Sequence, residues 1–532
     1  MKRPSPIRRW LVTLALFSLL VLFLLFVGGI LLSRRYSTII EKQIQENLAP
    51  GIKLDFESCK INLLARTIIF RRLEVHVRPD SVSDQHHIFK ARDVTLSGIH
   101  VLPFLINRKL HINRVVCQST DLTIERSLLR DSLVTDSRRK NNFAGAEIDY
   151  LKIDDLRLSL RKDTLIELRC RMNISARKIV IPEKNDVGQS HFQFTLDESS
   201  ADEIFYSPDG ALYNLAIKRI NLDERTNLVL DSIRIDPKFG KVEFARKVGK
   251  QIDRFDSVIP KVKINNLHAY PITDSTINAS GIHIYSPVLN VFRDNRLPFI
   301  KEHEVPLPVN ILKRIPWTLS ADTVQVHQAD ITYEEFPADG DSSGRVTFND
   351  LQASVFNFTN EDATGIDHID LDVKTKFMNS GLLAVSFDLP LQDKATYTAR
   401  GALLNFNLVT INSMTEPLAK MRIESGVVKQ MEFHFDYDEY SSAGEVEINY
   451  NNLKILSLTE KESKTVIDKF KTFLLNVFVI PKKKDEATPV EKRKGEIEFK
   501  RDPKRSIFNY WWKSLFTGIK SSYGLEMKNN KE

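Results

Sequence analysis

The segment Ile68–Val75 has the sequence IIFRRLEV, and the spacing of its apolar residues decides the fold class. Ile68 and Phe70 are separated by one residue, two arginines follow, and Leu73 and Val75 are again separated by one residue. A helix would turn these four side chains toward different faces, whereas alternation by two is the pattern of a β-strand. The segment therefore predicts strand structure with a two-residue step at its middle.

The same spacing occurs at many other places along the chain. Further occurrences begin at Val94, Leu110, Leu151, Leu215, Leu228, Val262, Ile277, Val324, Val346 and Ile448. Their intervals are irregular, which excludes a tandem repeat of fixed period. The pattern predicts a mainly β protein whose sheet is apolar on one face and polar on the other.

The two-residue step has two interpretations. A β-bulge would return the second half of the segment to the same face, and a hairpin turn would make two short strands of it. Asparagine and glycine pairs favour turns, whereas pairs of basic residues favour bulges. The turn-like pairs are Ser97-Gly98, Asn265-Asn266, Ser280-Gly281 and Asn451-Asn452, and the bulge-like pairs are Arg71-Arg72 and Lys218-Arg219. We expect a mixture of the two.

An uncharged apolar run, Leu11–Leu32, precedes all of these segments. Its 22 residues would form a helix of about 33 Å, enough to cross a hydrocarbon core of about 30 Å. Four basic residues and the amino terminus precede the run and Arg34-Arg35 follow it, which favours an amino terminus inside and a body outside the cytoplasm. A cleaved signal peptide is the alternative, but the run is long for one and Gly28–Ser33 is a poor cleavage site.

Composition, net charge and the number of cysteines restrict the classes of function that the protein can have. The chain has 532 residues, 42% hydrophobic and 27% charged, which is typical of a globular protein. Its net charge is +7, and basic residues gather near both ends, which suits anionic lipid head groups. A body outside the cytoplasm argues against nucleic-acid binding. Cys59, Cys117 and Cys170 are too few for a disulfide scaffold, so we expect buried thiols, although one bridge stays open.

The C-terminal region is predicted to contain two amphipathic helices around one strand. Glu460–Ile480 has a helical apolar stripe with Phe470 and Phe473, Gly495–Arg501 alternates like a strand, and Ser506–Ser522 forms a second helix. The membrane-interface candidates are Phe470, Phe473, Trp511, Trp512 and Phe516. Alternatively, these helices cover an open end of the sheet. A short helix is also expected within Asp236–Asp256, and a connector at Lys301–Pro316.

The sequence contains none of the familiar catalytic signatures. It has no Walker A loop, no GxGxxG, no GxSxG, no HExxH and no CxxC. The pair His86-His87 lies in a polar stretch and is predicted to be a solvated loop and not a metal site. We therefore expect a protein that is not an enzyme, with no catalytic residue, metal or cofactor.

Four features resemble the AsmA-like envelope proteins of Gram-negative bacteria, a family that includes TamB. They are the single span followed by TIIEKQIQENL and GIKLDFESCKINLLARTIIFRRLEVHV, the run Phe89–Arg126 with its Leu-Pro turn, the segment Gly401–Ile455, and the aromatic C-terminal helix. These are apolar patterns covering both ends of the chain well and the middle poorly.

The resemblance implies an N-terminal transmembrane helix followed by a long, curved, antiparallel β-sheet groove. Its parts would be residues 1–35 (cytoplasmic tip and anchor), 36–300 and 301–458 (two parts of the groove) and 459–532 (amphipathic helices with one strand). The lipid-groove candidates are Ile68, Phe70, Leu96, Ile112, Ile153, Leu156, Ile217, Ile233, Val326 and Phe348.

The implied function is passive binding or transfer of phospholipid for outer-membrane biogenesis. The protein would be a single-pass protein of the inner membrane with its bulk in the periplasm. Partners would be the inner membrane, phospholipid, and the outer membrane or envelope proteins. A non-enzymatic assembly or scaffold factor with a closed β core is the alternative.

Overall fold

The computed structural model describes residues 52–62, 65–77, 87–100, 109–126, 145–181, 193–270, 275–300, 304–361, 365–458 and 491–522. Of these, 68% are in strands and 11% in helices, and all 23 strands belong to one mixed sheet. The mainly β prediction is therefore confirmed. The predicted span Leu11–Leu32 and the predicted helix Glu460–Ile480 lie outside the described residues. So does Tyr36–Leu48, where the spacing of Ile39, Ile40, Ile44 and Leu48 predicts a short helix. Among the helices that are described, none is long and apolar enough to cross a membrane.

The chain forms two compact units, each described by itself below. The first contains Met1–Ile233 and Leu267–Thr276, and the second contains Arg234–Asn266 and Ile277–Glu532. The predicted division at residues 300 and 301 falls inside the second unit.

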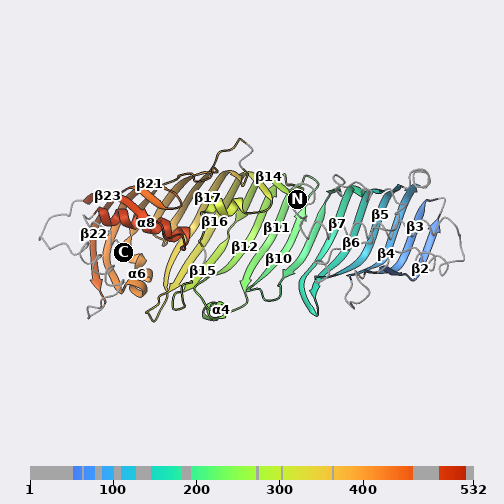
Figure 1. Ribbon diagram of the computed structural model, residues 1–532, viewed down its shortest axis with the longest axis horizontal. Helices are drawn as coiled ribbons and strands as arrows, with labels where there is room; N and C mark the ends of the chain where they lie inside the picture. The colour runs from blue at the N-terminus through green and yellow to red at the C-terminus, as the bar shows by residue number, and fades with distance from the viewer. Residues whose placement is uncertain are drawn as a thin grey trace. The chain divides into compact units, whose positions relative to one another are not determined.

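Strands of the first unit pair mostly in chain order (Figure 1). They are β1 (Ile52–Asp55), β2 (Ser58–Asn62), β3 (Thr67–Val77), β4 (His87–His100), β5 (Leu110–Glu125), β6 (Ala146–Lys162), β7 (Leu165–Ile181), β8 (Gln193–Leu196), β9 (Ser199–Tyr206), β10 (Tyr213–Leu222) and β13 (His268–Tyr270); β11 (Leu228–Pro237) contains the division between the units. Both β1 and β2 pair with β3, and β7 pairs with both β8 and β9.

The second unit contains the longest strands and the described helices. Its strands are β12 (Asp253–Asn265), β14 (Thr276–Tyr285), β15 (Val288–Asp294), β16 (Thr318–Phe336), β17 (Gly344–Thr359), β18 (His368–Phe377), β19 (Gly381–Pro390), β20 (Tyr397–Asn407), β21 (Met421–Tyr437), β22 (Ser441–Ser457) and β23 (Glu491–Lys500). Its helices are α4 (Lys241–Val248), α5 (Pro308–Lys313), the 3₁₀-helix η2 (Leu408–Ile411), α6 (Asn412–Ala419) and α8 (Ile507–Ser521). From β16 to β23 each strand pairs antiparallel with the next.

The prediction of a purely antiparallel sheet is wrong at two pairs. β5 and β6 are parallel, and so are β15 and β16. Parallel neighbours need a long crossover instead of a tight hairpin. The connections 126–145 and 295–317 have the required length, and the second contains the predicted connector Lys301–Pro316 together with α5.

In ten of the eleven segments the two-residue step lies within a strand and is bulge-like, so the hairpin interpretation is wrong for these ten. Nine of the eleven segments lie wholly inside one strand, the one at Val94 runs to the end of β4, and only the one at Val262 is divided, between β12 and β13. The second residue of the step has a positive φ in eight of them: Arg72, Gly98, Asp155, Ser232, Asn266, Gln328, Asp350 and Asn452. Asparagine and glycine tolerate this left-handed backbone as readily in a strand as in a turn, which is why their presence misled the prediction.

The step keeps the apolar residues on one face. In β3, Phe70 and Leu73 are both buried, although Arg71 and Arg72 between them are exposed. The residue with left-handed backbone thus shifts the in-and-out alternation of side chains by one position, so that the strand continues with its apolar residues on the same face. In β16 and β17 the step also shifts the register, between Val326 and Ala329 and again between Ala329 and Ile331.

The described helices partly match the prediction. α4 lies within the expected Asp236–Asp256, and α8 follows Ser506, whose hydroxyl accepts a hydrogen bond from the backbone amide of Asn509 and caps the helix. The polar, basic segment Lys482–Lys494 predicts a loop, but the strand β23 already begins at Glu491, so this prediction is wrong at its end. Lys492 and Lys494 form ion pairs with Glu447 of β22, which allows a strongly charged segment to pair as a strand.

Candidate apolar binding face

One face of the second unit carries continuous apolar rows. Directly paired residues on neighbouring strands point to the same side of a sheet. The first row contains Val324, Val355, Leu371, Phe387, Ala399, Phe435, Gly444 and Ile497. The second contains Val326, Ala353, Val373, Val385, Gly401, Phe433, Val446 and Gly495. We call the side that these rows occupy the apolar face of the second unit.

The apolar face is buried at one end and partly exposed at the other. From β20 to β23 it is nearly inaccessible, with Ala399 at 0%, Phe435 at 2% and Val446 at 1% exposure. From β16 to β19 the residues of the same rows are all partly exposed. Because all strands belong to one sheet, no second sheet among the described residues covers this part of the face.

Helix α8 covers the buried end (Figure 1). Trp511 packs against Phe387, with ring centroids 4.6 Å apart, and Tyr510 is buried against Tyr437 and Phe499. The hydroxyls of Ser442 and Ser514 are 2.7 Å apart and link the helix to β22. This packing agrees with the interpretation in which the C-terminal helix covers an end of the sheet.

Two glycines let α8 approach the sheet closely. A Cβ atom on Gly495 would lie 2.0 Å from the carbonyl oxygen of Gly518, and a Cβ on Gly518 would lie 2.6 Å from Ile497. Side chains at either position would hold the helix away from β23. The close packing of α8 on β23 therefore requires glycine at both positions.

The first unit has an apolar face of its own, most of it densely packed. Its rows include Ile68, Leu96, Val115, Leu151 and Ala176, and beside them Phe70, Val94, Cys117, Ile153 and Ile174. The structure thus brings six of the ten lipid-groove candidates onto one face of β3–β6. Five of these six, Ile68, Phe70, Leu96, Ile112 and Leu156, have 5% exposure or less.

The other candidates are more accessible. Ile153 is partly exposed, as are Ile217 on β10 and Ile233 on β11. On β10 and β11 no side chain is fully buried. Val326 and Phe348 of the second unit are also partly exposed. Accessibility therefore divides the candidates into a packed group of five on β3–β6 and an accessible group that contains Ile153 of β6 and the candidates on later strands, a distinction that spacing along the sequence does not contain.

The membrane-interface candidates divide in a similar way. Phe470 and Phe473 lie outside the described residues. Trp511 faces the sheet, whereas Trp512 is 50% exposed and stacks on the partly exposed Phe516. Phe508, which was not among the candidates, is 72% exposed. The outer side of α8 thus presents an aromatic surface next to Lys513 and Lys520, and burial lowers the pKa of both lysines.

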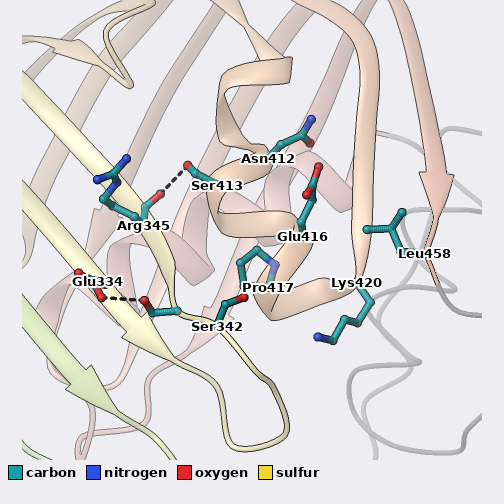
Figure 2. Close-up of a pocket in the computed structure, with 10 residues that line it drawn as sticks. Glu334, Ser342, Arg345, Asn412, Ser413, Glu416, Pro417, Lys420 and Leu458 are labelled. Atoms are coloured by element: carbon teal, nitrogen blue, oxygen red, sulfur yellow. Dashed lines mark hydrogen bonds between the residues drawn. The ribbon is translucent and has the colours of Figure 1, made fainter. Parts of the chain in front are cut away.

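A cavity of about 650 Å³ beside α6 is polar instead of apolar (Figure 2). Glu334, Arg345, Ser413, Glu416 and Lys420 are among its lining residues. Glu334 accepts a hydrogen bond from Ser343, and Ser413 donates one to the carbonyl of Arg345. With mostly charged and hydroxyl groups in its wall, this cavity does not suit a hydrocarbon chain.

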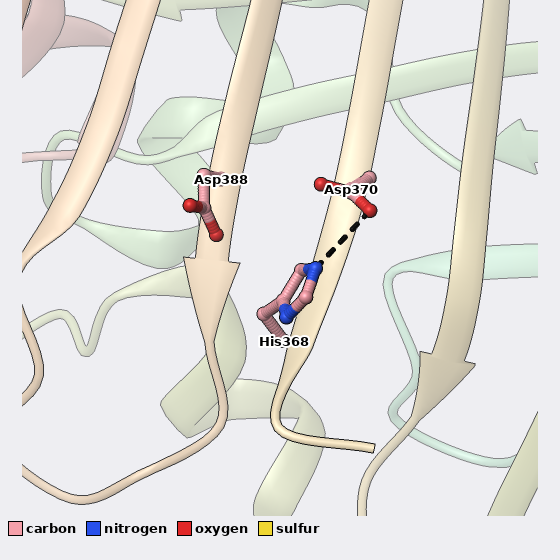
Figure 3. A group of neighbouring side chains, drawn as sticks. All are labelled: His368, Asp370 and Asp388. Carbon is pink, nitrogen blue, oxygen red and sulfur yellow. Dashed lines mark ion pairs between the residues drawn. The ribbon is translucent and has the colours of Figure 1, made fainter.

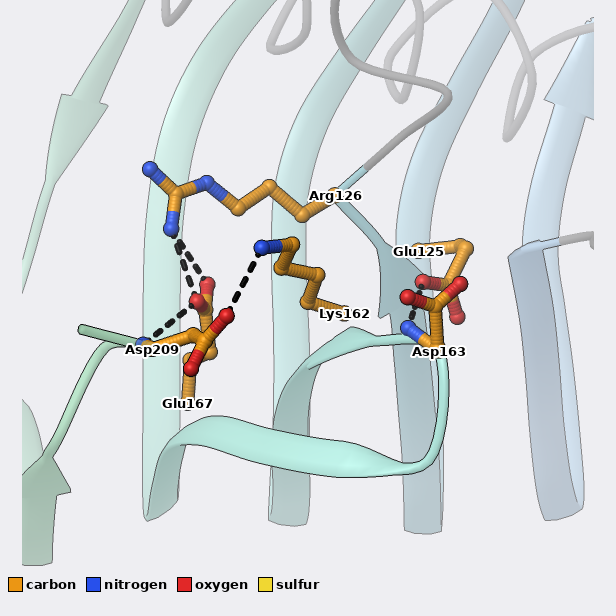
Figure 4. A network of polar contacts seen from close by, with 6 residues as sticks. All are labelled: Glu125, Arg126, Lys162, Asp163, Glu167 and Asp209. Carbon is orange, nitrogen blue, oxygen red and sulfur yellow. Dashed lines mark hydrogen bonds and ion pairs between the residues drawn. The ribbon is translucent and has the colours of Figure 1, made fainter.

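Hydrogen bonds and ion pairs between charged residues connect the ends of neighbouring strands in the first unit (Figure 4). Arg126 donates to both carboxylate oxygens of Glu167, at 2.8 and 2.7 Å, and the backbone amide of Asp209 donates to the same carboxylate at 2.9 Å. Glu167 is fully buried, and burial alone would raise its pKa, but the bonds from Asp209 and Arg126 outweigh it and lower that pKa. The network joins Glu167 of β7 to Arg126, which follows β5, across the intervening strand β6.

The three cysteines are free thiols, so no disulfide joins them. Cys117 lies buried in the apolar row of β5, and burial raises the pKa of both Cys117 and Cys59 to about 12. A thiol with such a pKa is scarcely ionised near neutral pH and is a poor nucleophile. His87 begins β4, and its Nδ1 accepts the backbone amide of Glu125, so at His87 the solvated-loop prediction is wrong; His86 lies outside the described residues.

No protein-family model matches the sequence, and no curated protein matches it significantly.

Proposed function

We propose that this protein binds phospholipid acyl chains on the partly exposed apolar face and passes them on passively, anchored in the inner membrane by Leu11–Leu32 with its body in the periplasm. The proposal includes membership of the AsmA-like group, a curved groove for the sheet and a contribution to outer-membrane biogenesis.

One observation carries the proposal. The apolar rows of β16–β19 continue, strand by strand, the rows that α8 buries on β20–β23, yet their own side chains are partly exposed. A contiguous apolar surface costs free energy in water, about 25 cal/mol per Å², unless an apolar partner covers it. Acyl chains are suitable partners because each methylene that they bury contributes about 0.8 kcal/mol.

The packed parts of the sheet support a second function. The rows of β3–β5 exclude solvent in the same way as a protein core, which favours the assembly or scaffold role for that part of the chain. Both functions can be compared in one experiment, since only lipid binding requires the accessible rows of β16–β19.

The test uses the full-length chain, purified in detergent, with its co-purified phospholipids quantified by mass spectrometry. Val326→Asp places a charge on the apolar face, and the matched control Gln325→Asp places the same charge on the opposite face of the same strand. The proposal predicts fewer lipids per chain for Val326→Asp and an unchanged number for Gln325→Asp. Circular dichroism confirms that both variants fold. Equal lipid content in folded wild type and Val326→Asp would support the scaffold role instead.

A further inference from the structure

The polar side of the second unit carries a cluster of metal-ligating residues that lipid binding does not explain. His368 and Asp370 lie on β18 and Asp388 lies on β19 (Figure 3). One ligand atom from each residue lies within 4.8 Å of the other two. Asp370 and Asp388 are direct partners in the register of the two strands. The neighbouring residues Leu371 and Phe387 belong to the apolar face, so this cluster occupies the opposite face of the same strands.

The cluster brings two carboxylates face to face, and His368 is the ion-pair partner of Asp370. Like charges directly opposite each other on paired strands are destabilising. Within the described part of the chain, Asp388 has no lysine or arginine ion pair. Its Oδ1 atom makes no contact with solvent and accepts no hydrogen bond. A buried carboxylate oxygen without a partner costs free energy, and a cation at this position would remove that cost.

His368 is oriented like a metal ligand. Its Nδ1 lies 2.5 Å from Oδ1 of Asp367, and its Nε2 faces Oδ2 of Asp370 at 3.4 Å. Histidines that bind metals usually donate their second nitrogen to a carboxylate in this way. Tetrahedral coordination with bonds of about 2.0–2.1 Å places ligand atoms about 3.3 Å apart, so the spacing of His368 and Asp370 already fits.

We propose that His368, Asp370 and Asp388 bind one divalent transition-metal ion of the zinc type. One imidazole nitrogen and two carboxylate oxygens suit this class, and three protein ligands leave a fourth position for water. Binding requires the ligand atoms, which lie within 4.8 Å of one another, to approach to about 3.3 Å. The ion neutralises the two opposed carboxylates and joins β18 to β19. This inference is independent of the proposed lipid function.

The experiment measures metal binding by the full-length chain in detergent after chelator treatment. Zn²⁺ binding is followed by calorimetry, and Co²⁺ binding by its visible absorption, which reports coordination geometry. We expect one ion per chain in the wild type and no such site in His368→Gln or Asp388→Asn. Asp367→Asn should weaken binding roughly 10- to 100-fold, because it removes the group that orients the histidine. The matched control is His434→Gln. His434 lies 3.9 Å from Asp436, as a histidine beside one carboxylate, but it does not belong to the group His368, Asp370 and Asp388.

Thermal unfolding distinguishes loss of the ion from loss of the fold. Without metal, Asp388→Asn should be at least as stable as the wild type, because it removes a like-charge contact. Added Zn²⁺ should raise the melting temperature of the wild type and of His434→Gln but not of Asp388→Asn. The inference is overturned if the wild type binds no ion, or if Asp388→Asn retains the site or gains the same thermal shift.

Discussion

Substituting Gly495 by alanine should loosen α8 from the sheet that it covers. The added Cβ would lie 2.0 Å from the carbonyl oxygen of Gly518 and 2.4 Å from the amide nitrogen of Ser522, both of them backbone atoms. Real Cβ atoms essentially never approach closer than 3.0 Å, so the two elements must separate by about 1 Å. Neither backbone segment can rotate away as a long side chain would.

The magnitude follows from what the helix buries. Overpacking of a well-packed region typically costs about 1–3 kcal/mol. A helix displaced in the closed state would also leave Tyr510 partly exposed, and full burial of such a side chain contributes about 1.5–3 kcal/mol. We therefore expect a loss of about 3 kcal/mol in the free energy of opening α8. At about 1.4 kcal/mol per tenfold, this corresponds to a roughly hundredfold acceleration of exchange.

Hydrogen exchange followed by mass spectrometry measures this opening. Peptides from β23 and α8 of Gly495→Ala should exchange about a hundredfold faster than in the wild type, while peptides from the first unit keep their rates. Gly281→Ala is the control, because its Cβ would meet no atom closer than 3.4 Å. Unchanged protection of α8 in Gly495→Ala, or equal acceleration in Gly281→Ala, would refute this account of how the helix is seated.

Three further predictions concern the strand step, the outer aromatic surface and the buried carboxylate. Gln328 has a positive φ, which strains a residue with a side chain, so Gln328→Gly should raise the stability of the second unit by up to about 1 kcal/mol in thermal unfolding. Gln325 has no positive φ, and Gln325→Gly should lower this stability by about 0.5–1 kcal/mol. Trp512→Ala should reduce flotation with anionic vesicles at unchanged stability, whereas Trp511→Ala should destabilise the second unit by about 2–3 kcal/mol. Glu167→Gln should destabilise the first unit by about 1–3 kcal/mol at pH 7. This is less than the cost of breaking a fully buried ion pair, because the partner Arg126 is exposed to solvent. The lowered pKa of Glu167 means that its stabilisation is fully present above its unfolded pKa of about 4.3 and is lost as pH falls through the lower, folded pKa, so in chemical denaturation the difference between the two proteins should shrink as pH falls below about 4.3.

The fold class could be predicted because alternation records which side of a strand faces the core. The segment Ile68–Val75 predicts a strand with one buried side, and β3 buries Ile68, Phe70, Leu73 and Val75. The nature of the step could not be predicted, since residue types that tolerate a positive φ serve turns and strand bulges equally well. Arg72 and Gln328 adopt the same conformation without any such preference.

Features that depend on contacts between distant parts of the chain could not be predicted from the sequence. The parallel pairing of β5 with β6 depends on how a long connection returns to the sheet, and local spacing does not record that path. Helix α6 was missed because it has only eight residues and includes Pro417, both unfavourable for a helix in isolation. The accessibility of Val326 and Phe348, compared with the burial of Phe70, depends on what covers each part of the face.

The metal cluster had no sequence signal of its own. His368 and Asp370 are two residues apart, but Asp388 enters only through the pairing of β18 with β19. The acidic residues of polar strand faces resemble one another in sequence, and only the register shows which of them meet.

Photocrosslinking in living cells tests the central claim most directly. Phe348 of β17 lies on the apolar side of the sheet, opposite Ile331 and Phe377, whereas Phe356 of the same strand lies opposite Thr323 and Asp370 on the polar face. A photoreactive phenylalanine analogue is placed at one position or the other in cells with radiolabelled phospholipid. Lipid attached at Phe348 and none at Phe356 is the result that acyl-chain binding predicts. Equal labelling at both positions, or no labelling at Phe348, would contradict it.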